Sequence, residues 1–177
     1  MAHFKTSRDA EEQERAAYNR ISKDLEAMER SPPSHCSAGE MNDQKENQSL
    51  VSNCLFDWEA TIHGPSDSPY AGGVFKLAMH FPQNYPHSPP EFKTKVYHPN
   101  IDSNNGSIGL DILRDKWTAA MTAEKVLLSI CSLLTNLNAE DPQERAVGDM
   151  YRNDPRGYET KAKKWTEKYA MQTDRSS

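Results

Sequence analysis

The chain is predicted to fold as one α+β domain, because helical and strand patterns are segregated along the sequence rather than alternating. Apolar residues recur at helical spacing near the start and again after Trp117, whereas residues 56–96 alternate with a period of two. A length of 177 residues, with 36% hydrophobic and 27% charged residues, suits a single domain.

The composition excludes several classes of protein. No run approaches the ~20 consecutive apolar residues of a membrane span, and a net charge of -5 argues against a nucleic-acid partner. The three cysteines lack CxxC spacing and the histidines lack metal-ligand spacing, which predicts no disulfide framework, no metal and no cofactor. Residues 1–15 have no apolar middle typical of a signal peptide. We therefore expect a reducing location, in the cytoplasm or the nucleus or both.

The N-terminal region divides into a polar extension, residues 1–15, and a helix. We expect the extension to be an arm that becomes helical near residue 16. Ala17, Ile21, Leu25 and Met28 then form one apolar stripe, and Pro32–Pro33 ends the helix.

Three segments are predicted to be antiparallel strands, with a further strand possible. Residues 56–62 and 74–81 alternate apolar with polar side chains, and 92–96 can form a third, shorter strand. Residues 40–53 lack period and bulk and are expected to form a long exposed loop. Residues 97–116 are expected to be irregular.

The C-terminal part is predicted to be helical. Thr122 caps a helix whose apolar stripe runs from Val126 to Leu137 and includes Cys131. Asp141-Pro142 and Asp154-Pro155 are each typical of a capped helix start. The last stripe consists of Tyr158, Ala162, Trp165 and Tyr169.

These patterns alone give little indication of catalytic residues. Asn100, in His98-Pro99-Asn100, could bond loop backbone or steady an oxyanion, and the pattern does not separate the two roles. Cys36 follows His35, but neighbours in sequence often point apart. On this basis the prediction would stop at an α+β domain.

Several longer strings resemble the ubiquitin-conjugating enzyme family across residues 16–171. They are GPSDSPYAGGVF (64–75), HFPQNYPHSPP (80–90), YHPNI (97–101), LDILRDKW (110–117), KVLLSICSLL (125–134) and WTEKYAM (165–171). The resemblance implies an N-terminal helix, a four-stranded antiparallel meander and three further helices, with an inserted loop near 40–53 and a short tail at 172–177. It also implies a ubiquitin-conjugating function, in which a cysteine thiolate carries ubiquitin as a thioester.

The position of that cysteine, just before Leu-Asp-Ile-Leu in the family pattern, is Gly109 here. A glycine has no side chain to carry a thioester, so we predict no thioester on this chain. Asn100, Asp111 and Asp141 match family positions that line the site, the two acids being suited to orient or deprotonate an incoming lysine.

Other positions match or depart from family surfaces for partners. Ser37 matches a position where a second ubiquitin binds non-covalently on the open face of the sheet. The positions implied to contact ubiquitin ligases or the activating enzyme are Arg20, Lys23, His87, Trp117, Ala119 and Ala120. His87 stands in place of an aromatic residue and Ala119 in place of a proline, which weakens the predicted ligase surface.

Three functions therefore remain open. The first is a catalytically inactive relative that binds ubiquitin, an active conjugating enzyme, a ligase or the activating enzyme without transfer. The second is an active enzyme whose cysteine is lost only in this sequence record. The third is an interaction scaffold unrelated to ubiquitin, with residues 40–53 as its contact.

Overall fold

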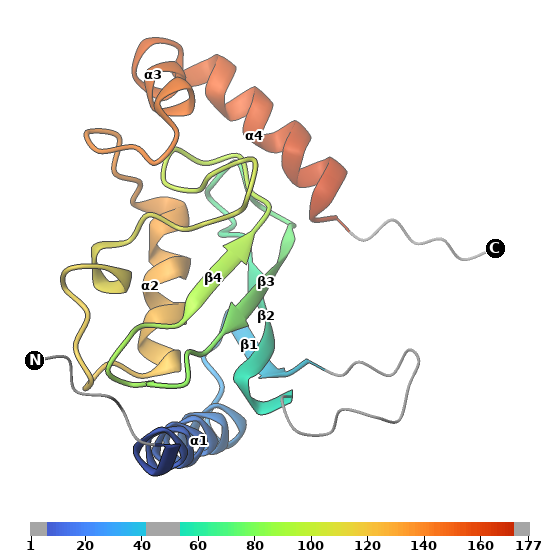
Figure 1. Ribbon diagram of the computed structural model, residues 1–177. Helices are drawn as coiled ribbons and strands as arrows, with labels where there is room; N and C mark the ends of the chain where they lie inside the picture. Colours follow the sequence, from blue (N-terminus) through green and yellow to red (C-terminus); the bar gives the residue numbers. More distant parts are fainter. Residues whose placement is uncertain (1–6, 42–53, 172–177) are drawn as a thin grey trace, which may run out of the picture.

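A four-stranded antiparallel sheet lies between an N-terminal helix at one end and two C-terminal helices at the other (Figure 1). The computed structural model describes residues 7–41 and 54–171. Its helices and strands are α1 (Ser7–Arg30), β1 (Cys36–Glu40), β2 (Asp57–His63), β3 (Val74–His80), β4 (Glu91–Thr94), α2 (Ala123–Thr135), α3 (Arg145–Asn153) and α4 (Pro155–Tyr169). Short 3-10 turns span Cys54–Phe56 and Asp111–Leu113. The predicted α+β class, four-stranded meander and flanking helices are thereby confirmed.

The register of the sheet explains its two faces. The strands pair in the order β1-β2-β3-β4, with Ala38 opposite Ala60, Ala60 opposite Leu77 and Leu77 opposite Thr94. Because successive strand residues point to opposite faces, Ala60 and Leu77 are buried while their neighbours Glu59 and Lys76 are exposed. One face therefore contributes to the core and the other faces solvent.

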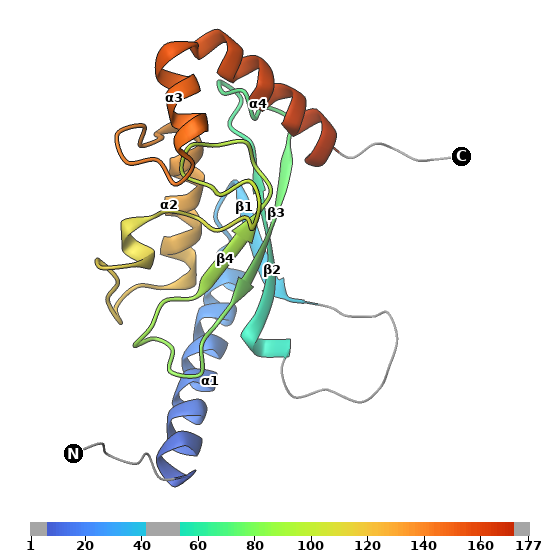
Figure 2. The ribbon, with the colours of Figure 1, turned by 45° about the horizontal axis from the view of Figure 1, so that its top comes forward.

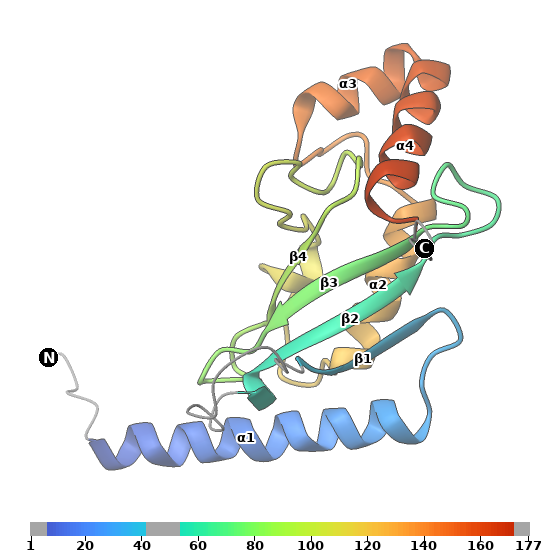
Figure 3. The same cartoon turned by 90° about the vertical axis from the view of Figure 1, so that its right-hand side faces the viewer.

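Helix α2 covers the buried face of the sheet, to the left of β3 and β4 in Figure 1. Its inward residues Val126, Leu127 and Ile130 are at most 2% exposed. Thr122 caps this helix through its hydroxyl, which accepts from the backbone N–H of Lys125, as the sequence predicts. Figures 2 and 3 show α1 along one end of the sheet and α3 and α4 at the opposite end.

Helix α1 begins at Ser7, so the prediction that the chain becomes helical only near residue 16 is wrong. Charged and other long side chains between residues 8 and 15 favour helix on their own, without a buried face. The first buried residue of α1 is nevertheless Ala17, where the apolar stripe was expected. Residues 1–6 and most of the 40–53 segment lie outside the described residues, as does the tail at 172–177.

Two details of the C-terminal part correct the sequence patterns. Asp141-Pro142 does not start a helix: α3 begins at Arg145, because the backbone N–H of Glu144 bonds the carbonyl of Pro99. Asp154-Pro155 does start α4, and the Asp154 side chain accepts from the N–H of Gly157. The buried stripe of α4 ends on Thr166, whereas Tyr169 is exposed.

No helix in the described ranges combines the length and apolarity needed to cross a bilayer.

Candidate functional site

The predicted site is built from two irregular segments, residues 98–111 and 138–144, held against each other by Asn100. Its amide nitrogen donates to the carbonyls of Asn138 at 2.9 Å and Asp141 at 3.3 Å, and its Oδ1 accepts from the N–H of Asn138 at 2.8 Å. Asn100 is 1% exposed. The side-chain amide is thus engaged with loop backbone, one of the two roles that the sequence left open.

His98 fixes the first of these segments to α2. Its Nδ1 accepts from the N–H of Asn100 at 3.0 Å, so its Nε2 carries the proton and donates to the carbonyl of Leu133 at 2.9 Å. The ring is fully buried, and this burial lowers the pKa of His98 to about 4. His98 is therefore neutral near pH 7 and has a structural role.

Gly109 lies half-buried between the two segments, and its N–H donates to the carbonyl of Asn100 at 2.8 Å. The space beside its Cα is filled: a Cβ built there would lie 2.9 Å from Gln143 Oε1 and 3.3 Å from Gln143 Cβ. Such approaches require the Gln143 side chain to move. A side chain at residue 109 would therefore compete with Gln143 for this space.

Gln143 is held in that space from both sides. Its Oε1 accepts from an Nη2–H of Arg114 at 2.5 Å, and its Nε2 donates to the Oγ of Ser107 at 3.3 Å. We call this Ser107–Gln143–Arg114 arrangement the glutamine bridge. It connects the segment before Gly109 to the segment after it.

The two predicted acids differ in their contacts. Asp111 accepts from Lys116 Nζ at 2.5 Å and from the N–H of Ile112 at 2.8 Å. The hydrogen bond from Lys116 lowers the pKa of Asp111. Asp141 is exposed, and its backbone carbonyl rather than its carboxylate receives Asn100. Lys116 of this chain thus binds the carboxylate of Asp111, which was expected to contact a substrate lysine.

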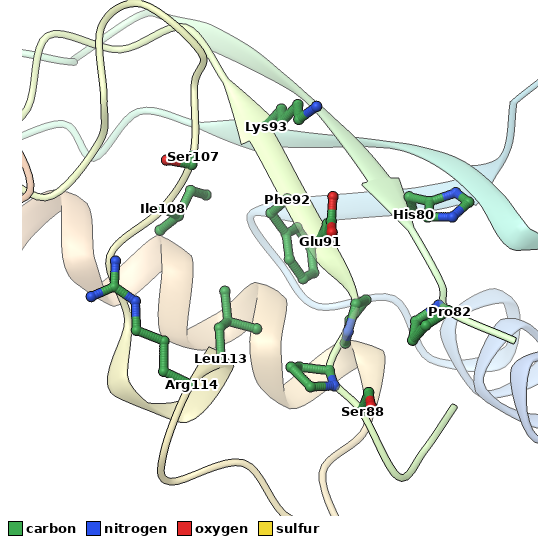
Figure 4. A pocket seen from close by; sticks show the side chains of 12 residues that line it. His80, Pro82, Ser88, Glu91, Phe92, Lys93, Ser107, Ile108, Leu113 and Arg114 are labelled. Carbon is green, nitrogen blue, oxygen red and sulfur yellow. The ribbon is translucent and has the colours of Figure 1, made fainter. Parts of the chain in front are cut away.

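A hollow of about 470 Å³ lies next to the glutamine bridge, between β4 and residues 107–114. Figure 4 shows Phe92 from β4 facing Ile108 and Leu113 across this space. Ser107 and Arg114 belong both to its lining and to the glutamine bridge. The bridge therefore forms one border of the hollow.

The predicted partner residues gather around one buried carboxylate, Asp24, which is 6% exposed. Its Oδ2 accepts from the hydroxyl of Tyr85 at 2.5 Å and from the N–H of Ala123 at 3.2 Å, and its Oδ1 accepts from Arg20 Nε at 3.3 Å. Arg20 also donates to the carbonyls of Ala119 and Met121. These bonds tie α1 to the 82–90 and 117–123 segments.

This network separates buried from accessible partner residues. The guanidinium of Arg20 is half-buried and occupied by internal acceptors, and Trp117 donates its indole N–H to the carbonyl of Pro86 at 2.9 Å. Lys23, His87, Ala119 and Ala120 are exposed around the network. The sequence placed Arg20 on a partner surface but contained no signal of its internal bonds.

Ser37 lies away from both regions, on the solvent face of the sheet. Its hydroxyl lies 2.6 Å from that of Thr61, and Lys76 Nζ lies 3.3 Å from Glu59 Oε1 on the same face. His63 and His80 both face this side and are exposed. Asp57 and His80 form a 2.6 Å pair there.

Comparison with known proteins identifies the family. The family model described as ubiquitin-conjugating enzyme matches residues 20–166. A crystal structure of a putative ubiquitin-conjugating enzyme from Plasmodium yoelii matches with 34% sequence identity and a TM-score of 0.75, covering 89% of this chain and 97% of that one.

The fold and the matched span thus define the class, and the chain belongs to the ubiquitin-conjugating enzyme family. Members of this family interact in general with ubiquitin, with activating enzymes and with ligases. Among the described residues, no group of three or more His, Cys, Asp or Glu side chains is arranged to hold a metal ion.

Proposed function

We propose that this chain is a non-catalytic member of the family that binds ubiquitin without forming a thioester. One observation carries the proposal: Gly109, which has no side chain to carry a thioester, stands at the predicted nucleophile position, with Gln143 as its nearest side-chain neighbour. A thioester requires a thiolate as nucleophile and leaving group. The nearest candidate in sequence, Ser107, has a hydroxyl that is a far weaker nucleophile near neutral pH.

The thiols elsewhere in the fold support this proposal. Cys36 opens β1 and is buried, and Cys131 lies half-buried on α2. Neither belongs to the segments that surround Gly109. Loading of ubiquitin onto either would therefore place it away from Asn100, Asp111 and Asp141.

We assign binding to the solvent face of the sheet around Ser37. This surface needs no thiol, and the strand residues on it are exposed or half-buried. No helix lies in front of β1 and β2 in Figure 3. Its side-chain contacts are between neighbours on the face itself, the Ser37–Thr61, Glu59–Lys76 and Asp57–His80 pairs. A ubiquitin surface that pairs with hydroxyls and with both signs of charge would fit here.

The first experiment tests whether the chain forms a thioester with ubiquitin. The protein is incubated with activating enzyme, ubiquitin and ATP and run on a non-reducing gel. We expect no reducible adduct. A thiol-sensitive ubiquitin adduct on the unaltered chain would overturn the proposal, and efficient charging of Gly109→Cys alone would favour the reading in which only the sequence record lost the cysteine.

The second experiment tests binding. Isotope-labelled ubiquitin is titrated with the protein and followed by NMR. Ser37→Arg should abolish the shift changes, whereas Ser66→Arg, at an exposed serine in the β2–β3 turn, should leave them intact. Equal titration curves for the two variants would place any binding elsewhere, and no shift changes with the unaltered protein would favour a scaffold unrelated to ubiquitin.

A further inference from the structure

Four lysines gather along one side of α4. Lys161, Lys164 and Lys168 are exposed and recur at spacings of three and four, which places them on one face of the helix. Lys95, from the segment that follows β4, reaches the same surface, because its Nζ lies 4.2 Å from the ring centroid of Tyr169. We call these four lysines the lysine stripe. Helix α4 lies at the periphery of the molecule in Figures 1 and 2, so the stripe faces solvent.

A row of aromatic rings lies under the lysine stripe. Tyr97 and Tyr169 flank Trp165, with ring centroids 5.6 Å and 5.1 Å from that of the tryptophan. Lys161 Nζ lies 4.8 Å from the ring centroid of Tyr97, and Lys168 Nζ lies 4.9 Å from that of Tyr169. Together with Lys95, three of the four ammonium groups thus rest on ring faces, an arrangement that the cation–π attraction stabilises.

The lysine stripe carries positive charge that the described part of the chain does not pair. Within residues 7–41 and 54–171, none of these four lysines forms a salt bridge. An ammonium group has three hydrogen-bond donors, and a contact with a ring face leaves the donors on its outer side available. A lysine held on a ring also has fewer rotamers to lose when it binds a ligand. The stripe therefore offers ordered positive charge to an anionic partner.

The length of the stripe and the charge of the chain favour a peptide over a nucleic acid as the partner. From Lys161 to Lys168 the helix rises by about 10 Å, a distance that an extended peptide spans with about three residues. A nucleic acid binds through phosphate contacts repeated over a longer path, and the net charge of -5 opposes a polyanion outside the stripe. A short acidic segment can instead confine its carboxylates to the stripe and pack an apolar side chain on the exposed ring of Tyr169.

We propose that the lysine stripe is a docking site for an acidic peptide segment of a partner protein, bound in an extended conformation. The carboxylates of the segment accept hydrogen bonds from the ammonium groups of the stripe, and an apolar side chain of the segment lies against Tyr169. The site uses none of the residues around Gly109 or around Ser37, so the inference stands whether or not the proposed function holds.

The experiment follows a short fluorescein-labelled peptide of glutamate and leucine by fluorescence anisotropy as the full chain is added at low salt. We expect saturable binding that weakens as salt is raised, because exposed charges are screened. Lys168→Glu should raise Kd by about fivefold. Lys163→Glu is the matched control, because it changes the total charge equally and Lys163 is exposed on the same helix, at least about 100° around its axis from the stripe. Its Kd should change by less than about twofold.

A second variant tests the ring support separately. Tyr169→Ala leaves the charge of the chain unchanged and removes the ring beneath Lys95 and Lys168. We expect Kd to rise by about threefold, because the two ammonium groups lose the contact that orders them. An unchanged Kd would contradict docking through ring-held lysines.

Three further outcomes would overturn the proposal. One is the absence of saturable peptide binding. Another is equal weakening by Lys168→Glu and Lys163→Glu, which would show that only the total charge matters. The third is displacement of the peptide by a lower concentration of a single-stranded oligonucleotide than of unlabelled peptide, which would assign the stripe to nucleic acid. Circular dichroism of each variant shows whether the fold is intact, and Lys168→Gln, which removes the charge without reversing it, should weaken binding by less than Lys168→Glu.

Discussion

The Gly109 region and the solvent face of the sheet differ in how they use their polar side chains. Around Gly109, Asn100, Gln143 and Asp111 are all occupied by groups of the same chain. On the sheet face, Ser37 and Thr61 pair only with each other and remain at the surface. Bonds to the backbone of another segment, as Asn100 makes, hold loops together, whereas pairs between exposed side chains such as Ser37 and Thr61 can exchange for contacts with a partner.

One prediction concerns chemical reactivity and restores a sulfur at residue 109. Gly109→Cys places a side chain where Gln143 now lies, so the new thiol should be shielded. Removing the amide in Gly109→Cys/Gln143→Ala should speed its reaction with iodoacetamide by about tenfold, since two hydrogen bonds no longer have to break. Gly109→Cys/Gln83→Ala, altered at an exposed glutamine, is the control. Equal alkylation rates of the two double variants would show that Gln143 does not shield a thiol at residue 109.

Acidic pH should lower the free energy of unfolding through His98. The pKa of His98 is about 4 in the folded chain, against a reference value of 6.5. The unfolded chain therefore binds a proton first as pH falls from 6.5 to 4, and stability present above pH 6.5 is lost across that window by about 3 kcal/mol. Urea unfolding at several pH values, with NMR titration of the ring, measures this. A His98 signal that titrates near 6.5 in the native protein would contradict it.

Substitutions in the two regions should then differ in cost. Asn100→Ala leaves backbone groups of Asn138 and Asp141 without their partner and should lower the free energy of unfolding by about 2 kcal/mol. Thr61→Ala on the sheet face should change it by less than about 0.5 kcal/mol. Urea denaturation of both variants gives the two values. Similar losses would show that the open face is also part of the stabilising network.

The smallest effect is expected at the Asp111–Lys116 pair, which is exposed. Lys116→Ala should leave the midpoint of urea unfolding unchanged, because exposed ion pairs contribute little. It should nevertheless raise the pKa of Asp111 toward its ordinary value, since Lys116 is the main cause of the lowered pKa. Carboxyl NMR with Lys125→Ala as the control follows this change. An unaltered Asp111 titration would show that backbone N–H groups alone hold its charge.

The sequence predicted the fold well where one signal dominated. Alternation over β2 and β3 identified both strands, and Thr122 and Asp154-Pro155 identified two helix starts. Asp141-Pro142 failed because a tertiary bond from Glu144 to Pro99 competes with the local cap signal. Such a bond joins segments far apart in sequence and has no local pattern.

The family resemblance proposed the residues of the candidate site, and the sequence contained no information on their arrangement. The family resemblance placed Gly109, Asn100 and Asp111 in one region, and the fold joins the first two through the bond from the Gly109 N–H to the Asn100 carbonyl. The glutamine bridge and the Lys116 contact depend on side-chain directions in loops, which no periodicity encodes.

The Asp24 network has a consequence for recognition. The carboxylate of Asp24 holds a helix and two loops in place, so this surface is ordered before any partner binds and need not rearrange on binding. We expect the exposed side chains of His87, Ala119 and Ala120 to influence which partner binds at this surface. Exchanging these three side chains for those of another family member should change the partner preference to that of the other member. The hydrogen bonds of Asp24 should remain intact.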